Sequence, residues 1–534
     1  MTKKVLLGDD AVALAALHSG INGVFGYPGT PSTEIFEYIA QHRPKDGSVV
    51  ANWAANEKVG LEEAVGMSFA GRRALVTMKH VGLNVAADPF MNAAITGAHG
   101  GLVIAVADDP SMHSSQNEQD SRYFADFGLI PCLEPSNQQE AYDMTREAFE
   151  LSERLEIPVM VRLVTRLAHS RADVVVRDPC EKNELNPAHD PARWTLLPVN
   201  ARVGYRKLLD KQPAINAYSE SSPFNTLALN DGRLGVIATG IAHNYLQEAL
   251  ADLDLSPEAR PSVLHLCVYP APVEKVRRFV AEIRSRGDGA EILVLEDGYP
   301  FIERQLGGLL GLSGVRLRGR LDGSLPRAGE LSPDSALRAL RGEIQPPPLP
   351  SALPPRPPAL CKGCPHGDTY TALSAALKES GATAGAVFSD IGCYTLGAYP
   401  PYEAIDTCLD MGASVSMAAG AADGGLHPSL AVLGDSTFMH SGMTPLVGAA
   451  KRNCPITVII VDNGTVAMTG RQDTMATGDA LENVVLGLGV AREHVRVLKP
   501  LPKAHDEMVR VLREEIAYQG TSVILARRPC IHVR

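Results

Sequence analysis

The chain has 534 residues, of which 45% are hydrophobic and 21% are charged, so it is long enough for about three domains with cores of their own. A net charge of -11 argues against nucleic acid or an anionic membrane as the main partner. No apolar stretch reaches the roughly 18 residues of a membrane span, and the N-terminus has no signal-type core, which predicts a cytoplasmic protein.

Strand-like and helical runs alternate along the first half of the chain, as is typical of doubly wound α/β layers. The expected buried strands there are residues 74–77, 102–106 and 158–161. A polar, irregular stretch from about residue 173 to 231 is followed by a second α/β pattern with strands at 234–239 and 292–296. These patterns predict an α/β protein with domains at 1–180, 200–343 and 359–534.

Residues 344–358 form the clearest boundary, because their sequence is dominated by proline. Such a segment is expected to be an extended, semi-rigid spacer. The strongest chemical motif lies after it.

That motif is Gly434-Asp435-Ser436, followed after twenty-five residues by Asp462-Asn463. Apolar runs precede both pieces, so both should open at one edge of a parallel sheet. Mg²⁺ prefers oxygen ligands, and the Asp435 carboxylate, the Asn463 amide oxygen and the Thr465 carbonyl could supply three of them. The sequence therefore predicts a site for a magnesium-bound diphosphate.

The spacing resembles the thiamine diphosphate signature, which runs from Gly-Asp-Gly to Asn-Asn. Ser436 replaces the third glycine and Asp462 the first asparagine, and neither is an expected metal ligand. An ordinary strand-to-helix turn is the alternative for Gly-Asp-Ser alone. The cofactor-binding set expected from the resemblance also includes Gly412 and Thr469.

Thiamine chemistry needs a buried carboxyl group that protonates the pyrimidine ring. Glu57 is the best candidate, because the helix that it opens carries small residues suited to close packing. Glu62 and Glu63 are the alternatives, with a solvated helix face as their expected role.

Long strings of sequence resemble the large, alpha subunit of indolepyruvate ferredoxin oxidoreductase, and the resemblance covers essentially the whole chain. They are GYPGTPSTE (26–34), TMKHVGLNVAADP (77–89), DDPSMHSSQNEQDSR (108–122), GCPH (363–366), SDIGCYTLG (389–397) and DNGTVAMTGRQ (462–472). The resemblance implies a pyrimidine-binding domain, a transketolase C-terminal-like middle domain and a diphosphate-binding domain, in that order.

The implied reaction is oxidative decarboxylation of an aryl 2-oxo acid to its acyl-CoA, with coenzyme A as co-substrate. The implied partners are a small beta subunit and ferredoxin or another electron carrier. Family members usually continue into a ferredoxin-like segment with two cysteine runs, whereas this chain stops at Arg534. We therefore expect a partner subunit to supply the electron exit.

Nine cysteines in so large a chain suggest reduced thiols or metal ligands rather than disulfides. By resemblance to related 2-oxoacid oxidoreductases, Cys361, Cys364, Cys393 and Cys530 would hold one [4Fe-4S] cluster. Zinc or inert thiols are the alternatives, since C-x-x-C alone separates none of them. The other five are expected to be packing residues: Cys132, Cys180, Cys267, Cys408 and Cys454.

Three further residues are candidates for the substrate site. By resemblance, the Thr30 hydroxyl would face the reacting carbonyl or carboxylate, with helix capping near Ser32 as its alternative. His80 follows an expected strand and could move protons near neutral pH, with a structural role as its alternative. Arg122 could bind a carboxylate through two nitrogens, although a surface ion pair is the commoner role.

Two other functions stay open at this stage. Without a cluster, the same cofactor site would serve a non-oxidative 2-oxo acid decarboxylase or carboligase. A catalytically silent assembly subunit is disfavoured, because such a subunit has no physical need to keep Asp435, Asn463 and Glu57 together.

Overall fold

The computed structural model describes residues 2–188, 190–253, 255–287, 289–307, 315–326, 329–343, 359–381, 387–408, 411–423 and 426–533. The predicted linker at 344–358 lies outside the described residues. The chain forms two compact units, Met1–Leu349 and Pro350–Arg534, and each is described by itself.

Unit 1 is built around a seven-stranded sheet with the order β12-β6-β7-β5-β4-β2-β3. All neighbouring pairs are parallel except β12 with β6. The strands are β2 (Gly23–Gly26), β3 (Val50–Trp53), β4 (Ala74–Lys79), β5 (Leu102–Asp108), β6 (Cys132–Leu133), β7 (Val159–Val164) and β12 (Val268–Tyr269). Every residue of β4, β5 and β7 is buried, as expected for central parallel strands.

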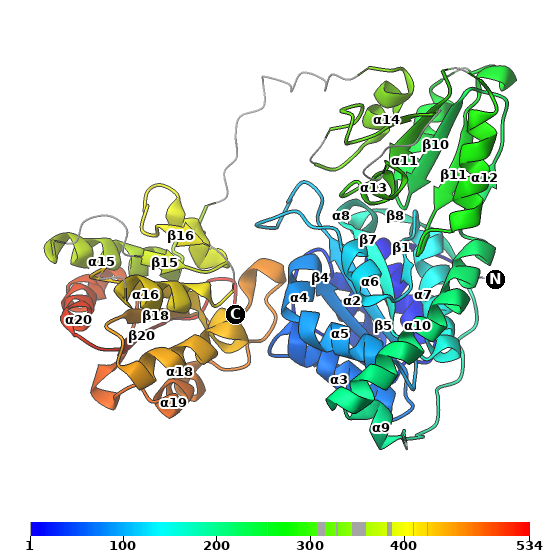
Figure 1. Ribbon diagram of the computed structural model, residues 1–534. Helices are drawn as coiled ribbons and strands as arrows, with labels where there is room; N and C mark the ends of the chain where they lie inside the picture. The colour runs from blue at the N-terminus through cyan, green and yellow to red at the C-terminus, as the bar shows by residue number, and fades with distance from the viewer. Residues whose placement is uncertain are drawn as a thin grey trace. The chain divides into compact units, whose positions relative to one another are not determined.

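Helices cover this sheet, as the blue and cyan part of Figure 1 shows. They are α1 (Gly8–His18), α2 (Thr33–His42), α3 (Glu57–Phe69), α4 (His80–Val85), α5 (Ala87–Thr96), α6 (Arg122–Gly128), α7 (Gln138–Leu155) and α8 (Thr165–His169). The amphipathic α7 shows how the sequence sets their limits. The Asn137 side chain caps it by accepting from Glu140 N, and it ends at Glu156 in the left-handed region with φ 49°.

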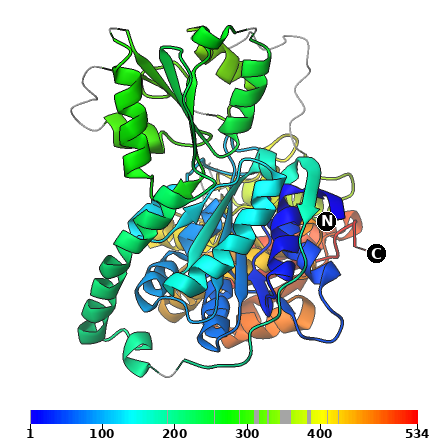
Figure 2. The ribbon, with the colours of Figure 1, turned by 90° about the vertical axis from the view of Figure 1, so that its right-hand side faces the viewer.

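A second, five-stranded sheet in unit 1 has the order β14-β13-β10-β11-β9. Only β9 runs antiparallel to its neighbour. The strands are β9 (Thr226–Ala228), β10 (Leu234–Thr239), β11 (Ser262–Leu266), β13 (Glu291–Leu295) and β14 (Arg316–Arg318), and the helices are α11 (Ala242–Ala251), α12 (Val273–Arg284), α13 (Phe301–Gly307) and α14 (Pro333–Leu340). Figure 2 shows this green lobe joined to the seven-stranded body.

The stretch predicted to be irregular, 173–231, is instead partly regular. It holds the end of β8 (Arg171–Val176), which pairs with β1 (Thr2–Leu7), and then α9 (Pro191–Trp194) and the 24-residue α10 (Pro198–Ser221). The prediction was wrong because the apolar residues of α10 do not form a clear helical stripe and the helix contains Pro213. Tertiary packing of Leu208 and Ile215 maintains this helix.

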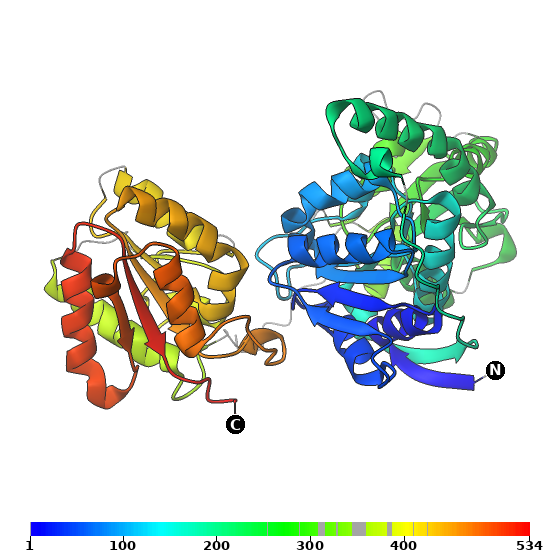
Figure 3. The ribbon, with the colours of Figure 1, turned by 90° about the horizontal axis from the view of Figure 1, so that it is seen from below.

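Unit 2 contains a six-stranded, all-parallel sheet with the order β16-β15-β17-β18-β20-β19. The strands are β15 (Val387–Ser389), β16 (Thr407–Cys408), β17 (Leu430–Gly434), β18 (Thr457–Asp462), β19 (Val495–Leu498) and β20 (Ser522–Arg527). The longer helices are α15 (Pro365–Glu379), α16 (Ala413–Asp423), α18 (Met443–Arg452), α19 (Gly478–Gly487) and α20 (His505–Ala517). Figure 3 shows this sheet between helices on both faces.

Candidate functional site

The ends of β2, β4 and β5 meet at one edge of the seven-stranded sheet, since these strands are parallel neighbours. The loop after β5 closes over the other two ends. In it, Ser114 Oγ donates to Thr30 O (3.3 Å), and Lys79 Nζ donates to Ser114 O (2.6 Å). The structure therefore brings Thr30 and the start of α4 together, through residues that the sequence analysis did not single out.

His80, the first residue of α4, is only 1% exposed. Its Nε2 lies 3.2 Å from Asn117 O, while Nδ1 is buried without a hydrogen-bond partner. Burial lowers the pKa of His80, so the ring is neutral near pH 7. With Nε2 donating to the carbonyl, Nδ1 is a buried acceptor that a bound group could satisfy.

Glu57 opens α3, whose N-cap residue Asn56 accepts from Val59 N at 3.0 Å. The Glu57 side chain is 6% exposed and packs against Gly82 in α4. A Cβ added at Gly82 would lie 2.4 Å from Glu57 Oε1, so the glycine makes room for the carboxylate close to His80. Glu62 and Glu63 are exposed, in agreement with a solvated helix face.

The turn that carries Thr30 is held by its neighbours rather than by Thr30 itself. Ser32 Oγ donates to Gly29 O (2.8 Å), and Gly29 N donates to Thr33 Oγ1 (2.9 Å). The N-cap residue of α2 is Ser32. Capping, the alternative role for Thr30, is therefore not what its side chain does.

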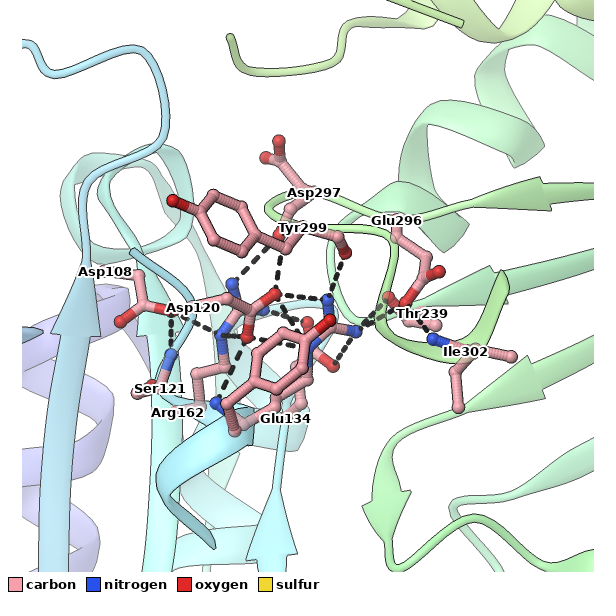
Figure 4. A network of polar contacts seen from close by, with 12 residues as sticks. Asp108, Asp120, Ser121, Glu134, Arg162, Thr239, Glu296, Asp297, Tyr299 and Ile302 are labelled. Atoms are coloured by element: carbon pink, nitrogen blue, oxygen red, sulfur yellow. Dashed lines mark hydrogen bonds and ion pairs between the residues drawn. The ribbon is translucent and has the colours of Figure 1, made fainter. Parts of the chain in front are cut away.

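Arg122 is not placed to bind a substrate carboxylate, which corrects the expectation for this residue. Its side chain is fully buried, and Nη2 pairs with Asp120 (2.5 Å) and Nη1 with Glu296 (3.0 Å). Figure 4 shows the acidic residues of this network, Asp120, Glu134 and Glu296. Nη1 also donates to Tyr269 Oη and Thr239 Oγ1, both at 3.2 Å. Every nitrogen of the guanidinium has a protein partner, so none is left for a substrate.

The sequence could not reveal this network, because its members come from distant segments of both sheets. Arg162 is also fully buried and pairs with Asp108 (2.7 Å) and Glu134. Burial by itself raises the pKa of Asp120, but Arg122 and Arg162 outweigh it and hold that pKa at about 2. The network therefore connects the seven-stranded sheet to the five-stranded sheet and stabilises their packing.

In unit 2, the pieces of the predicted signature follow β17 and β18, which are parallel neighbours. Asp435 accepts from Ser436 N (2.8 Å) and Gly464 N (2.7 Å) and is 2% exposed. Burial raises the pKa of Asp435 to about 7. A buried carboxylate that accepts from backbone donors fits a metal ligand, because a divalent ion would stabilise its charged form.

The loop after Asn463 is closed by Gln472, which the sequence analysis did not single out. Asn463 Oδ1 accepts from Thr465 N (3.0 Å), and Thr465 Oγ1 donates to Gln472 O (3.0 Å). Thr469 Oγ1 bonds Gln472 Oε1 at 2.6 Å. The loops after β17 and β18, called here the loop system, thus hold carbonyl, amide and carboxylate oxygens. These are the donors that Mg²⁺ prefers.

Asp462 has a different environment from Asp435. Its carboxylate accepts from Arg527 Nε and Gly478 N, both at 3.0 Å, and also bonds the Thr477 hydroxyl. These partners anchor β18 to β20 and the start of α19, in keeping with the expectation that Asp462 is not a metal ligand.

Gly412 has φ +100°, and a Cβ there would lie 2.6 Å from the Ser441 side chain. Its N–H donates to Asp390 Oδ2 (3.0 Å), while Ser414 N donates to Oδ1 (2.6 Å). Asp390, at the end of β15, thus fixes the turn before α16. Asp390 lies in the stretch SDIGCYTLG (389–397), but the sequence analysis did not single it out as a site residue.

The four predicted cluster cysteines gather beside this loop system. Burial, together with the nearby thiols of Cys364, Cys530 and Cys361, raises the pKa of Cys393 to about 12. Cys530 N donates to Asn463 O (3.0 Å), so this cysteine is tied to the predicted metal ligand. Cys361 Sγ lies 3.4 Å from His532 Nε2.

Among the described residues, no three of these four thiols fall within 4.8 Å of one another as a single-ion site. Thiolates on one zinc ion would be about 3.8 Å apart, from Zn–S bonds of about 2.3 Å. The described thiols therefore do not match the spacing of ligands on one zinc ion.

Two protein-family models match the chain. Residues 14–210 match "Pyruvate flavodoxin/ferredoxin oxidoreductase, thiamine diP-bdg", and residues 390–525 match "Thiamine pyrophosphate enzyme, C-terminal TPP binding domain". The fold and these matches define a thiamine diphosphate-dependent 2-oxoacid:ferredoxin oxidoreductase.

Similar chains narrow this class. The indolepyruvate oxidoreductase subunit IorA of Archaeoglobus fulgidus is 38% identical, over 99% of this chain and 86% of that protein. The subunit of the same name from Methanothermobacter thermautotrophicus is 36% identical, over 99% and 87%. The chain therefore belongs to the indolepyruvate oxidoreductase subunit IorA family.

A solved structure shares the fold. It is the 2-oxoglutarate:ferredoxin oxidoreductase of Magnetococcus marinus, with a TM-score of 0.51, 17% identity, and coverage of 64% of this chain and 65% of that one. Across the residues that the structure describes, no helix is both long and apolar enough to cross a bilayer.

Proposed function

We propose that the chain is the large catalytic subunit of an enzyme that oxidatively decarboxylates aryl 2-oxo acids to aryl-acetyl-CoA. Electrons would leave through one [4Fe-4S] cluster on Cys361, Cys364, Cys393 and Cys530. The observation that carries this proposal is the bond from Cys530 N to Asn463 O, because it ties the thiol group to the loop of the cofactor site.

Within unit 2, the proposed Mg²⁺ ligands are the Asp435 carboxylate, the Asn463 amide oxygen and the Thr465 carbonyl. Gly434, Ser436, Gly412 and Thr469 would let backbone and hydroxyl groups approach the diphosphate. The support is the buried oxygen-rich loop system and the raised pKa of Asp435. When bound, thiamine diphosphate supplies the electron sink that makes decarboxylation feasible.

In unit 1, Glu57 is proposed to hold and move a proton at the pyrimidine ring of the cofactor, in keeping with its burial against Gly82. His80, neutral and with an unpartnered Nδ1, would accept a proton or hydrogen bond from the substrate. Thr30 would orient the 2-oxo acid through its hydroxyl. The closed loop at Ser114 would limit water there.

The proposed substrate class is an aryl 2-oxo acid such as indolepyruvate, because the similar proteins are named indolepyruvate oxidoreductase subunit IorA. The word subunit in that name supports a multi-subunit enzyme. We propose the small beta subunit of the same oxidoreductase as partner, and ferredoxin or another carrier as electron acceptor.

Visible absorbance of the anaerobically purified complex tests this proposal. With thiamine diphosphate, Mg²⁺ and CoA present, addition of indolepyruvate should bleach a broad iron-sulfur band. Iron bound to this subunit should fall in Cys361→Ala, and it should persist in Cys180→Ala, a half-buried cysteine of unit 1. A colourless subunit that still releases carbon dioxide would contradict the cluster and favour a non-oxidative decarboxylase.

A further inference from the structure

We propose that Asp9, Glu34 and His169 form a binding site for a divalent transition-metal ion, zinc or manganese, in unit 1. The three residues come from three packed helices. Asp9 lies in the first turn of α1, Glu34 in the first turn of α2, and His169 is the last residue of α8. None of them belongs to the thiamine site described above.

Their ligand atoms already lie close together. One atom from each residue falls within 4.8 Å of the other two, and His169 Nε2 is 3.6 Å from Glu34 Oε1. Two ligands of one ion at about 2.1 Å are roughly 3 to 3.4 Å apart, so only small side-chain shifts are needed. A Cβ added at Gly8 would lie 2.2 Å from Leu167 O, which shows how closely α1 and α8 approach.

A second observation points to a missing ligand. Asp9 is 0% exposed, and neither of its carboxylate oxygens has a hydrogen-bond partner. Glu34 Oε2 is also buried without one. Leaving buried polar atoms unpaired costs free energy, and nearly all such atoms in proteins have partners. A bound cation would pair with both carboxylates.

The donors select the kind of ion. Two carboxylates and one neutral imidazole carry a charge of about -2, which a divalent ion balances. Imidazole favours zinc over Mg²⁺ and Ca²⁺, which prefer all-oxygen shells, while the two carboxylates also suit Mn²⁺. The His169 side chain is 36% exposed, so solvent can reach the site and fill a fourth position.

Such an ion would stabilise the turn that carries Thr30. Glu34 lies four residues after Thr30, within the first turn of the helix that follows the Thr30 turn. A metal ion joining α1, α2 and α8 would therefore hold this turn in place. The alternative is a plain His169–Glu34 ion pair beside a protonated Asp9.

Manganese binding to the full chain tests the proposal. The protein is first saturated with thiamine diphosphate and Mg²⁺, so that the Asp435 site is filled, and free Mn²⁺ is then followed by electron paramagnetic resonance. Mn²⁺ avoids thiolates, which keeps the cysteines out of the measurement. We expect one bound equivalent, displaced by Zn²⁺.

The matched variants are Asp9→Asn and Asp10→Asn, which make the same charge change in one helical turn. Mn²⁺ affinity should fall at least tenfold in Asp9→Asn and stay unchanged in Asp10→Asn. His169→Gln, at the exposed end, provides the same test if Asp9→Asn does not fold. Absence of the extra equivalent in the parent protein, or equal affinity in the folded site variants, would overturn the proposal.

Discussion

Asp435 and Asp462 follow neighbouring strands, yet their surroundings give them different properties. Arg527 neutralises Asp462, whereas Asp435 is buried among backbone donors and its pKa rises to about 7. Only Asp435 therefore gains substantially from a metal ion.

Asp435→Asn should weaken binding of magnesium thiamine diphosphate at least tenfold. The amide keeps the side-chain size but removes the charge, and its NH₂ group faces the Ser436 or Gly464 N–H. Isothermal calorimetry measures the change, with the exposed Asp473→Asn as control. Unchanged affinity in folded Asp435→Asn would contradict the assignment.

Glu57→Gln should lower kcat by about 10² to 10⁴, because general acid catalysis contributes on that scale. Cofactor affinity, measured by calorimetry, should change little. Glu62→Gln in the same helix removes only the exposed ion pair with Lys58 and should leave kcat unaltered. Full activity in Glu57→Gln would exclude the proposed proton role.

Asp435, Asn463, Glu57 and His80 could be proposed from the sequence because each directly follows a strand or begins a helix at a sheet edge, and their roles stay predictions. Strand ends and helix starts can be recognised from a short local stretch of the sequence. The Arg122 prediction was wrong, because residues that surround it come from β10, β12 and the segment after β13. Those contacts exist only after folding.

At the scale of a single element, the buried strand β11 makes stability depend on pH. His265 is 3% exposed, its Nε2 lies 2.8 Å from Cys267 Sγ, and it stacks on His243. Burial lowers the pKa of His265 to about 3. The folded state thus binds this proton less well than the unfolded chain, so stability is present above about pH 6.5 and is lost as pH falls toward 3.

His265→Gln should reduce the acid sensitivity of unit 1. Between pH 7.5 and pH 5, the parent protein should lose about 2 kcal/mol more than the variant, from roughly 1.5 pH units at 1.36 kcal/mol each. Urea unfolding followed by tryptophan fluorescence reports unit 1 alone, because Trp53 and Trp194 are the only two tryptophans in the sequence. An equal loss in both proteins would refute this role.

The predicted buried strands of both units are confirmed, while α10 was missed. Strands such as β5 and β18 are continuous apolar runs, a signal that is independent of context. The helix α10 depends on packing against a surface that sequence does not show.

At the scale of the whole molecule, the Arg122 network joins two sheets within unit 1. Arg122→Met should lower the stability of unit 1 by about 3 to 5 kcal/mol, because it removes the guanidinium that pairs with the buried carboxylates of Asp120 and Glu296. Arg166→Met, which removes the exposed pair with Glu330, should cost at most about 1 kcal/mol. Urea unfolding followed by tryptophan fluorescence measures the free energy of unfolding of both variants. Similar small losses in the two would show that the network does not stabilise the packing of the two sheets.

The division of function between the units leads to the most direct test. Unit 2 carries the proposed metal ligands and thiols, and unit 1 the proposed proton-transfer groups, so the proposed oxidative turnover uses residues of both units. Products formed from indolepyruvate and CoA by the anaerobic complex are measured together with reduction of a low-potential acceptor. We predict indoleacetyl-CoA, with two electrons transferred for each carbon dioxide released. Release of indoleacetaldehyde with no acceptor reduction would contradict the account.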